Sequence, residues 1–424
     1  MSRFLFIATL VIAGEMVFGL PFHTARFFRP TLLEVFGFSN TELGDLFAVF
    51  GVTAMLSYFP GGALADRYEA RSLMSVALIA TGAGGLYMAM IPGPLGMGIL
   101  YGYWGITTGF LFWGALIRAT RMWGGQRSQG KAFGILEGGR GLAAFAVAGV
   151  TVLVFASLMP ADAALATDAE RRSSFQIVLV LYSMLTMLLG LLTWSVIPAA
   201  GEEARSQSNP LTGMATVLRR PIVWAQAAVI VCAYCGYKGL DYYSDYAVRV
   251  LGMNEVDAAK FATWGALIRP FAAIGAGFIA DRFDASRTIG VTFAVMLAAF
   301  AALSLLAPAG GLTMIYANVF VSFVAVFALR GVYFALLEDY RTPAYLTGAA
   351  VGMISLLGYT PEIFFAPIAG RIIDANPGLL GYQHFFVFLA AIGALGVLVV
   401  FVLIRMARPG RELWPTASKS RPIA

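Results

Sequence analysis

Long apolar stretches of about 20 residues recur along the chain, each separated from the next by a short polar segment. A helix needs about 20 apolar residues to cross the hydrocarbon core of a bilayer, so each stretch predicts one membrane-spanning helix. The predicted helices of the first half are 4–27, 41–65, 72–91, 95–119, 131–158 and 173–197. Those of the second half are 222–250, 256–280, 288–307, 312–337, 344–373 and 383–405. The pattern therefore predicts an all-α integral membrane protein with twelve transmembrane helices.

One polar segment is much longer than the others and divides the predicted helices into two sets of six. We predict an N-terminal six-helix bundle over residues 1–197 and a cytoplasmic linker over 198–220. A C-terminal six-helix bundle with a short cytoplasmic tail is predicted over 221–424. The Lys and Arg residues between the helices lie mostly on the side of the linker and of both termini, which predicts that this side is cytoplasmic. The expected location is a bacterial inner (plasma) membrane.

A short box occurs once in each half. Gly62-Ala63-Leu64-Ala65-Asp66-Arg67 stands 215 positions before Gly277-Phe278-Ile279-Ala280-Asp281-Arg282, and a basic residue follows each box (Arg71 and Arg287). Self-similarity at a fixed offset indicates duplication of a structural unit. Transporters built from such repeats bind their substrates between the repeats, near the middle of the membrane. The box therefore predicts two pseudo-symmetric bundles with a site between them.

The composition excludes several classes of protein. Hydrophobic residues make up 59% of the chain and charged residues only 12%, about half the charged share of a soluble domain. The two cysteines, Cys232 and Cys235, are too few for a disulfide framework and are expected to be buried. We find no nucleotide-binding loop, metal-ligand cluster or nucleophile elbow in the sequence, so we expect neither an enzyme nor a cofactor nor a resident metal. No nucleic-acid partner is expected.

Several ionisable residues lie inside the predicted helices. Because a charge deep in the bilayer costs at least about 2.5–3.5 kcal/mol, each must face protein or water. The basic ones are Arg118, Arg140, Lys238, Arg269 and Arg330. The acidic ones are Glu15, Glu137, Asp241, Asp245 and Glu362. They avoid the third, sixth, ninth and twelfth helices, a segregation that predicts a central polar cavity lined by the others.

The basic residues predict an anionic substrate, because a guanidinium presents a fixed fork of donors to an oxyanion. Arg269 and Arg330 have no acidic neighbour within one turn of their own helices, which favours them for substrate contact. Tyrosines of the seventh and eleventh helices could hold the organic body of the substrate. The predicted substrate-binding set is Arg118, Arg140, Lys238, Arg269, Arg330, Tyr242, Tyr243 and Tyr359. Two alternatives remain: Arg118 could merely extend to the interface, and the tyrosines could be core filling.

The acidic residues predict the coupling to an ion gradient. Glu137 and Arg140, like Lys238 and Asp241, are three residues apart and share a helix face. Each pair is either an inert bridge or a carboxylate that a proton or the substrate displaces. The predicted proton-coupling set is Glu15, Glu137, Asp241 and Glu362. His23 could be a proton site, but its place near Arg26 and Arg29 at the outer surface favours an interfacial residue.

Two places favour an interrupted helix. Gly236 and Gly239 weaken the seventh helix, and Gly358-Tyr359-Thr360-Pro361 weakens the eleventh. A helix weakened in this way could flex as a cavity opens and closes.

The boxes resemble the signature of the major facilitator superfamily, which reads G-x-x-x-D-R/K-x-G-R/K-R/K between the second and third helices. Gly62, Asp66, Arg67 and Arg71 match it, whereas Glu69 and Ala70 depart from it. The second copy matches at Gly277, Asp281 and Arg282. The resemblance implies a twelve-helix transporter in which these residues control conformation. It also implies that Asp66 binds a neighbouring helix N-terminus and a basic partner in the outward-facing state.

A second resemblance covers about 25 residues. Trp113-Gly114-Ala115-Leu116-Ile117-Arg118, Trp123 and Gln129-Gly130-Lys131-Ala132 are similar to the organophosphate/phosphate antiporters and their organic-anion relatives. The expected function is a monomeric secondary active transporter of a small organic anion, coupled to protons or to sodium. The alternatives are a proton-driven drug or metabolite efflux antiporter with Glu15 or Glu362 as proton carrier, a membrane sensor, and a membrane-embedded lipid enzyme.

Overall fold

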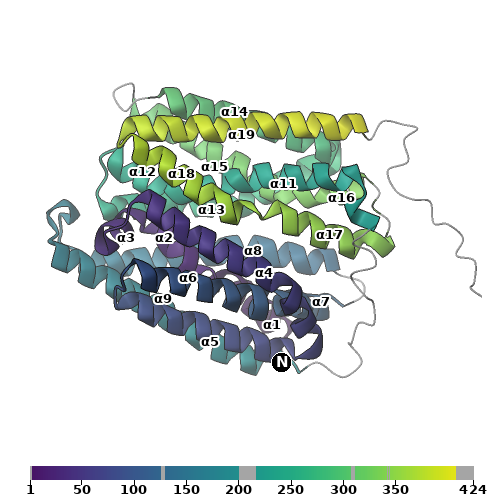
Figure 1. Ribbon diagram of the computed structural model, residues 1–424, viewed down its shortest axis with the longest axis horizontal. Coiled ribbons are helices and arrows are strands. Elements are labelled where there is room, and N and C mark those ends of the chain that lie inside the picture. Colours follow the sequence, from purple (N-terminus) through teal and green to yellow (C-terminus); the bar gives the residue numbers. More distant parts are fainter. Residues whose placement is uncertain are drawn as a thin grey trace, which may run out of the picture.

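The computed structural model describes residues 2–125, 129–199, 216–306, 311–340, 342 and 344–406. Over these residues the chain forms helices joined by turns, without a β-strand. Figure 1 shows the long helices running side by side along the longest axis of the molecule. The helices that precede residue 199 form the lower part of this view, and those that follow residue 216 form the upper part.

The part of the first half that the structure describes forms twelve helical segments. They are α1 (Arg3–Met16), η1 (Gly19–His23), α2 (Thr24–Phe27), α3 (Arg29–Phe36), α4 (Asn40–Arg67), α5 (Ala70–Ala89), α6 (Pro94–Ile106), η2 (Thr107–Trp113), α7 (Gly114–Gly124), α8 (Gln129–Leu158), η3 (Ala163–Leu165) and α9 (Asp168–Val196). The described segments of the second half are α11 (Pro221–Gly239), η5 (Leu240–Tyr242), α12 (Tyr243–Arg249), α13 (Glu255–Phe283), α14 (Ala285–Leu305), α15 (Leu312–Val332), η7 (Tyr333–Ala335), α16 (Leu336–Asp339), α17 (Ala344–Gly358), α18 (Pro361–Ala375) and α19 (Leu379–Met406).

The predicted spans correspond to these segments. Among the described residues, nine helices are long and apolar enough to cross a membrane, and two bent pairs raise the number to 11. One bent pair is α1 with η1 and α2, and the other consists of the two parts of α4. The remaining predicted span, 95–119, corresponds to α6, η2 and α7, in which a π-helical segment separates two α-helices. The all-helical membrane fold is therefore confirmed.

Equivalent caps begin the helices that carry the boxes. The Ser39 hydroxyl accepts a hydrogen bond from the Glu42 amide at 3.1 Å, and the Glu42 carboxylate accepts one from the Ser39 amide at 2.8 Å. In the second half, the Asn254 side chain accepts a hydrogen bond from the Asp257 amide at 2.8 Å. Both caps satisfy free amides of a first helical turn. The duplication of the sequence is thus matched by equivalent helix starts at α4 and α13.

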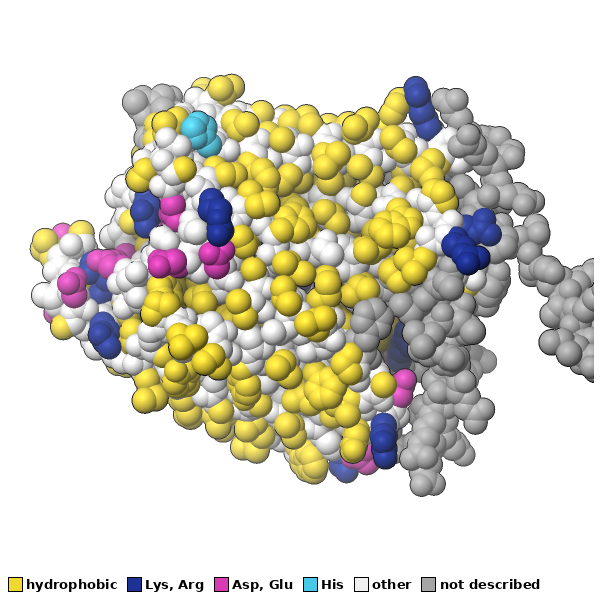
Figure 2. Space-filling view, viewed as in Figure 1, with side chains coloured by type: hydrophobic (Ala, Val, Ile, Leu, Met, Phe, Trp, Pro, Cys, Tyr) yellow, Lys and Arg dark blue, Asp and Glu magenta, His cyan; other side chains and the backbone are white. Residues whose placement is uncertain are grey.

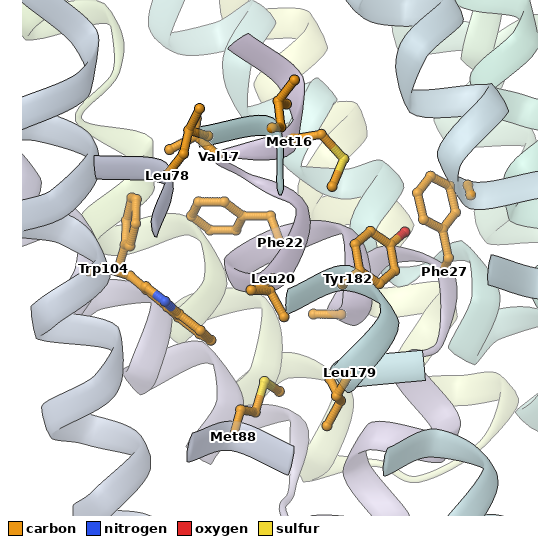
Figure 3. Close-up of a cluster of buried hydrophobic side chains, with 14 of the residues drawn as sticks. Met16, Val17, Leu20, Phe22, Phe27, Leu78, Met88, Trp104, Leu179 and Tyr182 are labelled. Carbon is orange, nitrogen blue, oxygen red and sulfur yellow. The ribbon is translucent and has the colours of Figure 1, made fainter. Parts of the chain in front are cut away.

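Two clusters of buried apolar side chains fill the interior. One draws mainly on residues 6–197 and the other on 217–403. Figure 3 shows part of the first cluster, where Phe22, Trp104 and Tyr182 converge from different helices. Residues 200–215 of the predicted linker lie outside the described residues, so the division into two bundles joined by a linker stays a prediction.

The outer surface along the helices is apolar. Leu56, Phe271 and Leu305 are among the large apolar side chains that are mostly exposed. Figure 2 shows apolar side chains over the middle of the molecule and charged ones toward its two ends. An apolar belt of this kind fits hydrocarbon and not water.

The two halves meet most closely where α4 crosses α18. Gly44 lies against the Ala366 backbone, Gly51 against that of Glu362, and Gly370 against that of Asn40. A Cβ at Gly51 would lie only 2.7 Å from the Glu362 carbonyl oxygen. Small residues allow this approach of two membrane helices. We name the end of the molecule that carries the two boxes the box end and the opposite end, at α3 and α12, the far end; this crossing lies toward the far end.

Candidate functional site

The first helix of each half is interrupted in the middle of the bundle. In the first half, the π-helical segment η1 contains Gly19 and Pro21, and the chain bends by 43° between α1 and the following segment. In the second half, α11 ends at Gly239 and the 3₁₀ segment η5 follows. Proline lacks an amide hydrogen and glycine weakens helices, which explains both breaks. The breaks carry polar side chains to the contact between the halves.

A ring of four alternating charges joins the halves. Glu15 of α1 accepts a hydrogen bond from Arg140 Nε at 2.8 Å and one from Arg269 Nη1 at 3.2 Å. Glu137 of α8 binds Arg140 Nη1 at 2.7 Å and lies 3.5 Å from Arg269 Nη2. Arg269 belongs to α13 of the second half, so its two carboxylate partners both come from the first half. The two carboxylates and two guanidiniums of this charge ring neutralise one another.

A second series of alternating charges lies along α11. Asp241 Oδ1 accepts a hydrogen bond from Arg26 Nε at 2.6 Å, and Asp241 Oδ2 lies 3.2 Å from Lys238 Nζ. Lys238 Nζ also lies 3.1 Å from Glu362 Oε2. The other oxygen of Glu362 accepts a hydrogen bond from the Tyr234 hydroxyl. This charge chain again contains two positive and two negative groups.

The contact between Arg26 and Asp241 marks the symmetry of the fold. These residues are 215 positions apart, which is the offset between the two boxes. Equivalent positions of a duplicated unit touch each other only near the axis that relates the two copies. The pseudo-twofold axis therefore passes close to this ion pair, where α2 meets η5.

Arg330 is a partly exposed cation that differs from the paired cations of the charge ring and the charge chain. Its guanidinium carbon lies 4.1 Å from the centre of the Tyr237 ring and 5.5 Å from that of Tyr234. Among the described residues it has no carboxylate partner, and its Nη1 atom is buried without a hydrogen bond. Tyr333 and Tyr359, whose hydroxyls lie 3.3 Å apart, are on the adjoining segments. Arg330 is thus a cation that aromatic faces hold in place while leaving its donors unused.

Two carboxylates of the cluster keep contact with solvent. The Glu137 side chain is 49% exposed although it binds arginines of both halves, and that of Glu362 is 16% exposed. Glu15 and Asp241, in contrast, are almost fully buried. Arg330 and Tyr359 are also partly exposed. Glu137, Arg330 and Glu362 are therefore charged residues of this region that solvent reaches, whereas their partners Glu15 and Asp241 are buried.

Further polar pairs hold the halves together at the far end. Asn40 accepts a hydrogen bond from Arg29 Nε at 2.7 Å and donates one to Asp245 at 3.2 Å. Ser244 donates a hydrogen bond to the Arg26 carbonyl at 2.8 Å. A surface pair joins the halves in the same region, with Arg371 Nη1 2.8 Å from an oxygen of Asp45. These cross-half contacts close the far end of the site.

The architecture agrees with the comparisons with known proteins. The profile of the family described as Major Facilitator Superfamily matches residues 5–366. The chain belongs to this superfamily. It is 28% identical over 417 residues to the inner membrane protein YqcE of Escherichia coli (strain K12), covering 95% of this chain and 94% of YqcE. It is 26% identical to the probable nitrate/nitrite antiporter NarK1 of Thermus thermophilus, covering 90% of this chain and 86% of NarK1.

A solved structure shows the same fold. The crystal structure of a bacterial homologue of the human lysosomal transporter Spinster, in an inward-facing and occupied conformation, superposes with a TM-score of 0.71 at 15% identity. The superposition covers 95% of this chain and 96% of that one. The expectation of a superfamily transporter and not an enzyme is therefore confirmed. The narrower resemblance to organophosphate antiporters stays a prediction.

The aspartates of the two superfamily boxes lack, among the described residues, the contacts expected of an outward-facing state. Among the described residues, Asp66 and Asp281 make no hydrogen bond or ion pair. Arg71 binds Glu69 at 2.7 Å, and Glu69 is one of the residues that depart from the superfamily signature. Gly62 and Gly277 have open space around them. The contact expected for Asp66 in an outward-facing state is thus not formed here, where the halves are joined at the far end instead.

Three residues of the predicted substrate set lie elsewhere. Arg118 Nη1 donates hydrogen bonds to the Ala65 and Tyr68 carbonyls at 2.5 and 3.0 Å, so it caps the end of α4. Tyr242 and Tyr243 are fully buried, and their hydroxyls bind the Ala366 carbonyl and Ser322. In this conformation Tyr242 and Tyr243 therefore fill the core, as the alternative interpretation expected, and their contact with the substrate stays a prediction.

Two other expectations also need correction. Arg269 is not free of acidic partners, because Glu15 and Glu137 reach it from α1 and α8. His23 is not an interfacial residue: it is buried, and its Nε2 lies 3.2 Å from Glu15 Oε1. Spacing along one helix cannot find a partner on another helix. The match between His23 and Lys238 at the repeat offset was the available signal that His23 lies inside.

Several functional contacts were missed in the sequence. Arg26 and Tyr237 were not among the candidates, although Arg26 donates to both Asp241 and the Tyr237 hydroxyl. The repeat offset between Arg26 and Asp241 could have identified that pair. The intrahelical pairs Glu137–Arg140 and Lys238–Asp241 are confirmed as contacts at 2.7 and 3.2 Å. Within the described residues, no group of three His, Cys, Asp or Glu side chains could hold a metal ion.

Proposed function

We propose that this protein is a secondary active transporter that moves a small organic anion across the membrane by alternating access. The observation that carries the proposal is Arg330. It is a partly exposed cation that lies on the faces of Tyr237 and Tyr234 and has no carboxylate partner among the described residues. A partly exposed guanidinium with unused donors is suited to an oxyanion.

The arrangement of the contacts supports alternating access. The crossing of α4 and α18 and the pairs at Asn40, Asp45 and Arg26 hold the halves together at the far end. At the other end, Asp66 of the first box has no hydrogen bond or ion pair with any residue that the structure describes. If both termini are cytoplasmic, as the distribution of basic residues predicts, this conformation gives the cytoplasm access to the site. A rocking motion of the halves would break the far-end contacts and form others at the box end.

The charge ring supplies a way to couple transport to protons. Glu137 is the exposed member of the ring and shares Arg140 and Arg269 with Glu15. A proton on Glu137 would remove one carboxylate from Arg269, the one guanidinium of the ring that comes from the second half. The link between the halves would then weaken, which couples protonation to conformation. Glu15, Asp241 and Glu362 remain the other candidates for coupling, and sodium remains the alternative ion.

Two relatives support the proposed substrate class and the proposed location. NarK1 is named a probable nitrate/nitrite antiporter, which makes an anion a reasonable substrate class for this chain. YqcE is named an inner membrane protein, which supports the same location. The charge at Arg330 disfavours the alternative of an efflux pump for lipophilic cations, because a cation would approach an uncompensated positive charge.

Uptake by purified protein in liposomes tests the proposal. We expect the wild type to accumulate small organic anions, faster with an imposed pH gradient than without it. Arg330→Ala should reduce the initial rate at least tenfold, and Arg330→Lys should retain part of it. The matched control is Arg172→Ala, because Arg172 is an exposed arginine of α9 that has no ion pair among the described residues. Equal uptake by Arg330→Ala and wild type would overturn the site, and exchange of lipophilic cations for protons would favour the efflux pump.

A further inference from the structure

We propose that the substrate carries a single negative charge, attached to an uncharged body with a flat face or hydroxyl groups. The proposal rests on the proposed function, since it specifies which anions the site at Arg330 accepts. A monocarboxylate or monosulfonate fits, whereas dicarboxylates and phosphate monoesters do not.

The charge balance around Arg330 sets the number of charges. The charge ring contains Glu15, Glu137, Arg140 and Arg269, which cancel one another. The charge chain contains Arg26, Asp241, Lys238 and Glu362, which also cancel. Among the described residues, the inner cations without a carboxylate partner are Arg29 and Arg330. Arg29 is fully buried at the far end, where it donates to Asn40 and lies over the Tyr242 ring, so of these two only Arg330 is accessible to a ligand. The site therefore has one positive charge available for a ligand.

The cations that are paired with carboxylates cannot readily bind a second negative charge of the ligand. Arg140, Arg269 and Lys238 are almost fully buried and lie 2.7–3.5 Å from their carboxylates. A ligand that took one of them would leave a buried carboxylate without its partner, which is strongly unfavourable. The exposed members of the cluster other than Arg330 are themselves acidic, Glu137 and Glu362. A second anionic group of the ligand would therefore meet the carboxylates of Glu137 and Glu362.

The aromatic residues around Arg330 determine the rest of the ligand. Tyr234 packs against Tyr237 and Tyr359 with ring centres 5.6 and 5.0 Å apart. The Tyr234 hydroxyl is used by Glu362, and that of Tyr237 accepts a hydrogen bond from Arg26. The Tyr333 and Tyr359 hydroxyls bind each other, so one donor of that pair is left for a ligand. Flat apolar faces with few free hydroxyls suit a ring or a hydroxylated chain that has no charge of its own.

Protonation of Glu137 would change this selectivity. With a neutral Glu137, the charge ring has one positive charge in excess, and the site as a whole has two. A dianion then becomes acceptable. The variant Glu137→Gln imitates this state and gives the proposal a test that does not depend on the identity of the natural substrate.

The experiment measures binding of matched pairs of ligands that differ by one carboxylate. We would titrate purified protein in detergent with gluconate and glucarate, with benzoate and phthalate, and with lactate and malate. Calorimetry and thermal unfolding give the affinities. In the wild type we expect the monoanion of at least one pair to bind at least tenfold more tightly than its dianion. Arg330→Gln should abolish this binding.

The charge variants complete the test. Glu137→Gln should lower the ratio of monoanion to dianion affinity at least tenfold in the pair that binds. Asp168→Asn is the matched control, because it removes a negative charge from a side chain that is 100% exposed; it should leave the ratio unchanged. Thermal unfolding of each variant without ligand shows whether it is folded. A second folded variant, Glu362→Gln, should shift the ratio in the same direction.

The outcomes separate the two proposals. Tighter binding of the dianion in every pair that binds would overturn the single-charge inference and leave anion transport standing. An unchanged ratio in both folded variants, Glu137→Gln and Glu362→Gln, would also overturn it. Binding of no anion of any pair, or binding that Arg330→Gln does not affect, would overturn the proposed function together with this inference.

Discussion

Replacement of Gly44 by alanine should shift the protein away from the conformation described here. Gly44 lies on α4, where that helix crosses α18 of the other half. A Cβ at this position would lie 2.6 Å from the Ala366 carbonyl carbon and 2.9 Å from the Pro367 nitrogen. Non-bonded carbon atoms are comfortable at about 3.5–4.0 Å, so the helices must separate by about 1 Å. The atoms in the way belong to the backbone, which cannot rotate aside as a side chain can.

The size of the expected shift between the two conformations follows from the energetic cost of overpacking the interface. Extra atoms in a closely packed interface cost about 1–3 kcal/mol. That cost applies to the conformation in which α4 and α18 touch and is relieved when the halves separate at the far end. An energy of this size corresponds to a shift of about 5- to 150-fold in the balance between the two conformations.

Single-molecule distance measurements can follow this shift. Arg172→Cys and Lys260→Cys place labels on exposed positions of the two halves at the far end. The native Cys232 and Cys235 are buried and should not react. We expect Gly44→Ala to increase the fraction of molecules with a long distance between the labels. Gly149→Ala in α8 of the same half is the control, because no described atom lies within 4 Å of a Cβ there.

One result would refute the reasoning. If Gly44→Ala remained folded and its distance distribution matched that of Gly149→Ala, the crossing of α4 and α18 would not define the closed far end. A loss of thermal stability without any change in the distances would mean that the two halves do not separate at this crossing.

Three further predictions concern the buried polar groups and the surface. Glu15→Gln should lower the free energy of unfolding by about 3–5 kcal/mol, because Arg140 and Arg269 lose a shared buried carboxylate. Denaturant titration in detergent measures this loss, and a loss below about 1 kcal/mol would contradict the charge ring. Asp45→Asn breaks an ion pair that is half-exposed and should cost less than about 1 kcal/mol in the same assay; a larger loss would show that this pair is essential to the interface. Cys235 should react with a maleimide only after denaturation, since it is buried, and rapid labelling of the folded protein would contradict that burial.

The features that depend on neighbours along the chain could be predicted from the sequence. The apolar runs correspond to the observed helices, and the breaks at Gly239 and before Pro361 occur where glycine and proline predicted them. The pairs Glu137–Arg140 and Lys238–Asp241 form because helix geometry alone places residues three apart on one face.

The partners across helices could not be predicted in the same way. Arg269 was favoured for substrate contact because its own helix has no acid within one turn, yet two carboxylates of the other half bind it. Tyr242 and Tyr243 were expected at the substrate, yet the rotation of their segment buries them. Whether a polar side chain faces a neighbouring helix, the core or solvent depends on how each helix is rotated and where it crosses the others.

The sequence by itself determined that the chain lies in a membrane, that it is duplicated, and that its charges concentrate in the helices that line the middle. These properties follow from hydropathy, from repetition and from the cost of a charge in lipid, all of which are local or additive along the chain. Only the tertiary structure decided which of those charges neutralise one another. Ion pairing depends on distances of a few ångströms between helices, and packing sets these distances. For that reason Arg330 could be recognised as a partly exposed cation without a carboxylate partner among the described residues only after the helices were in place.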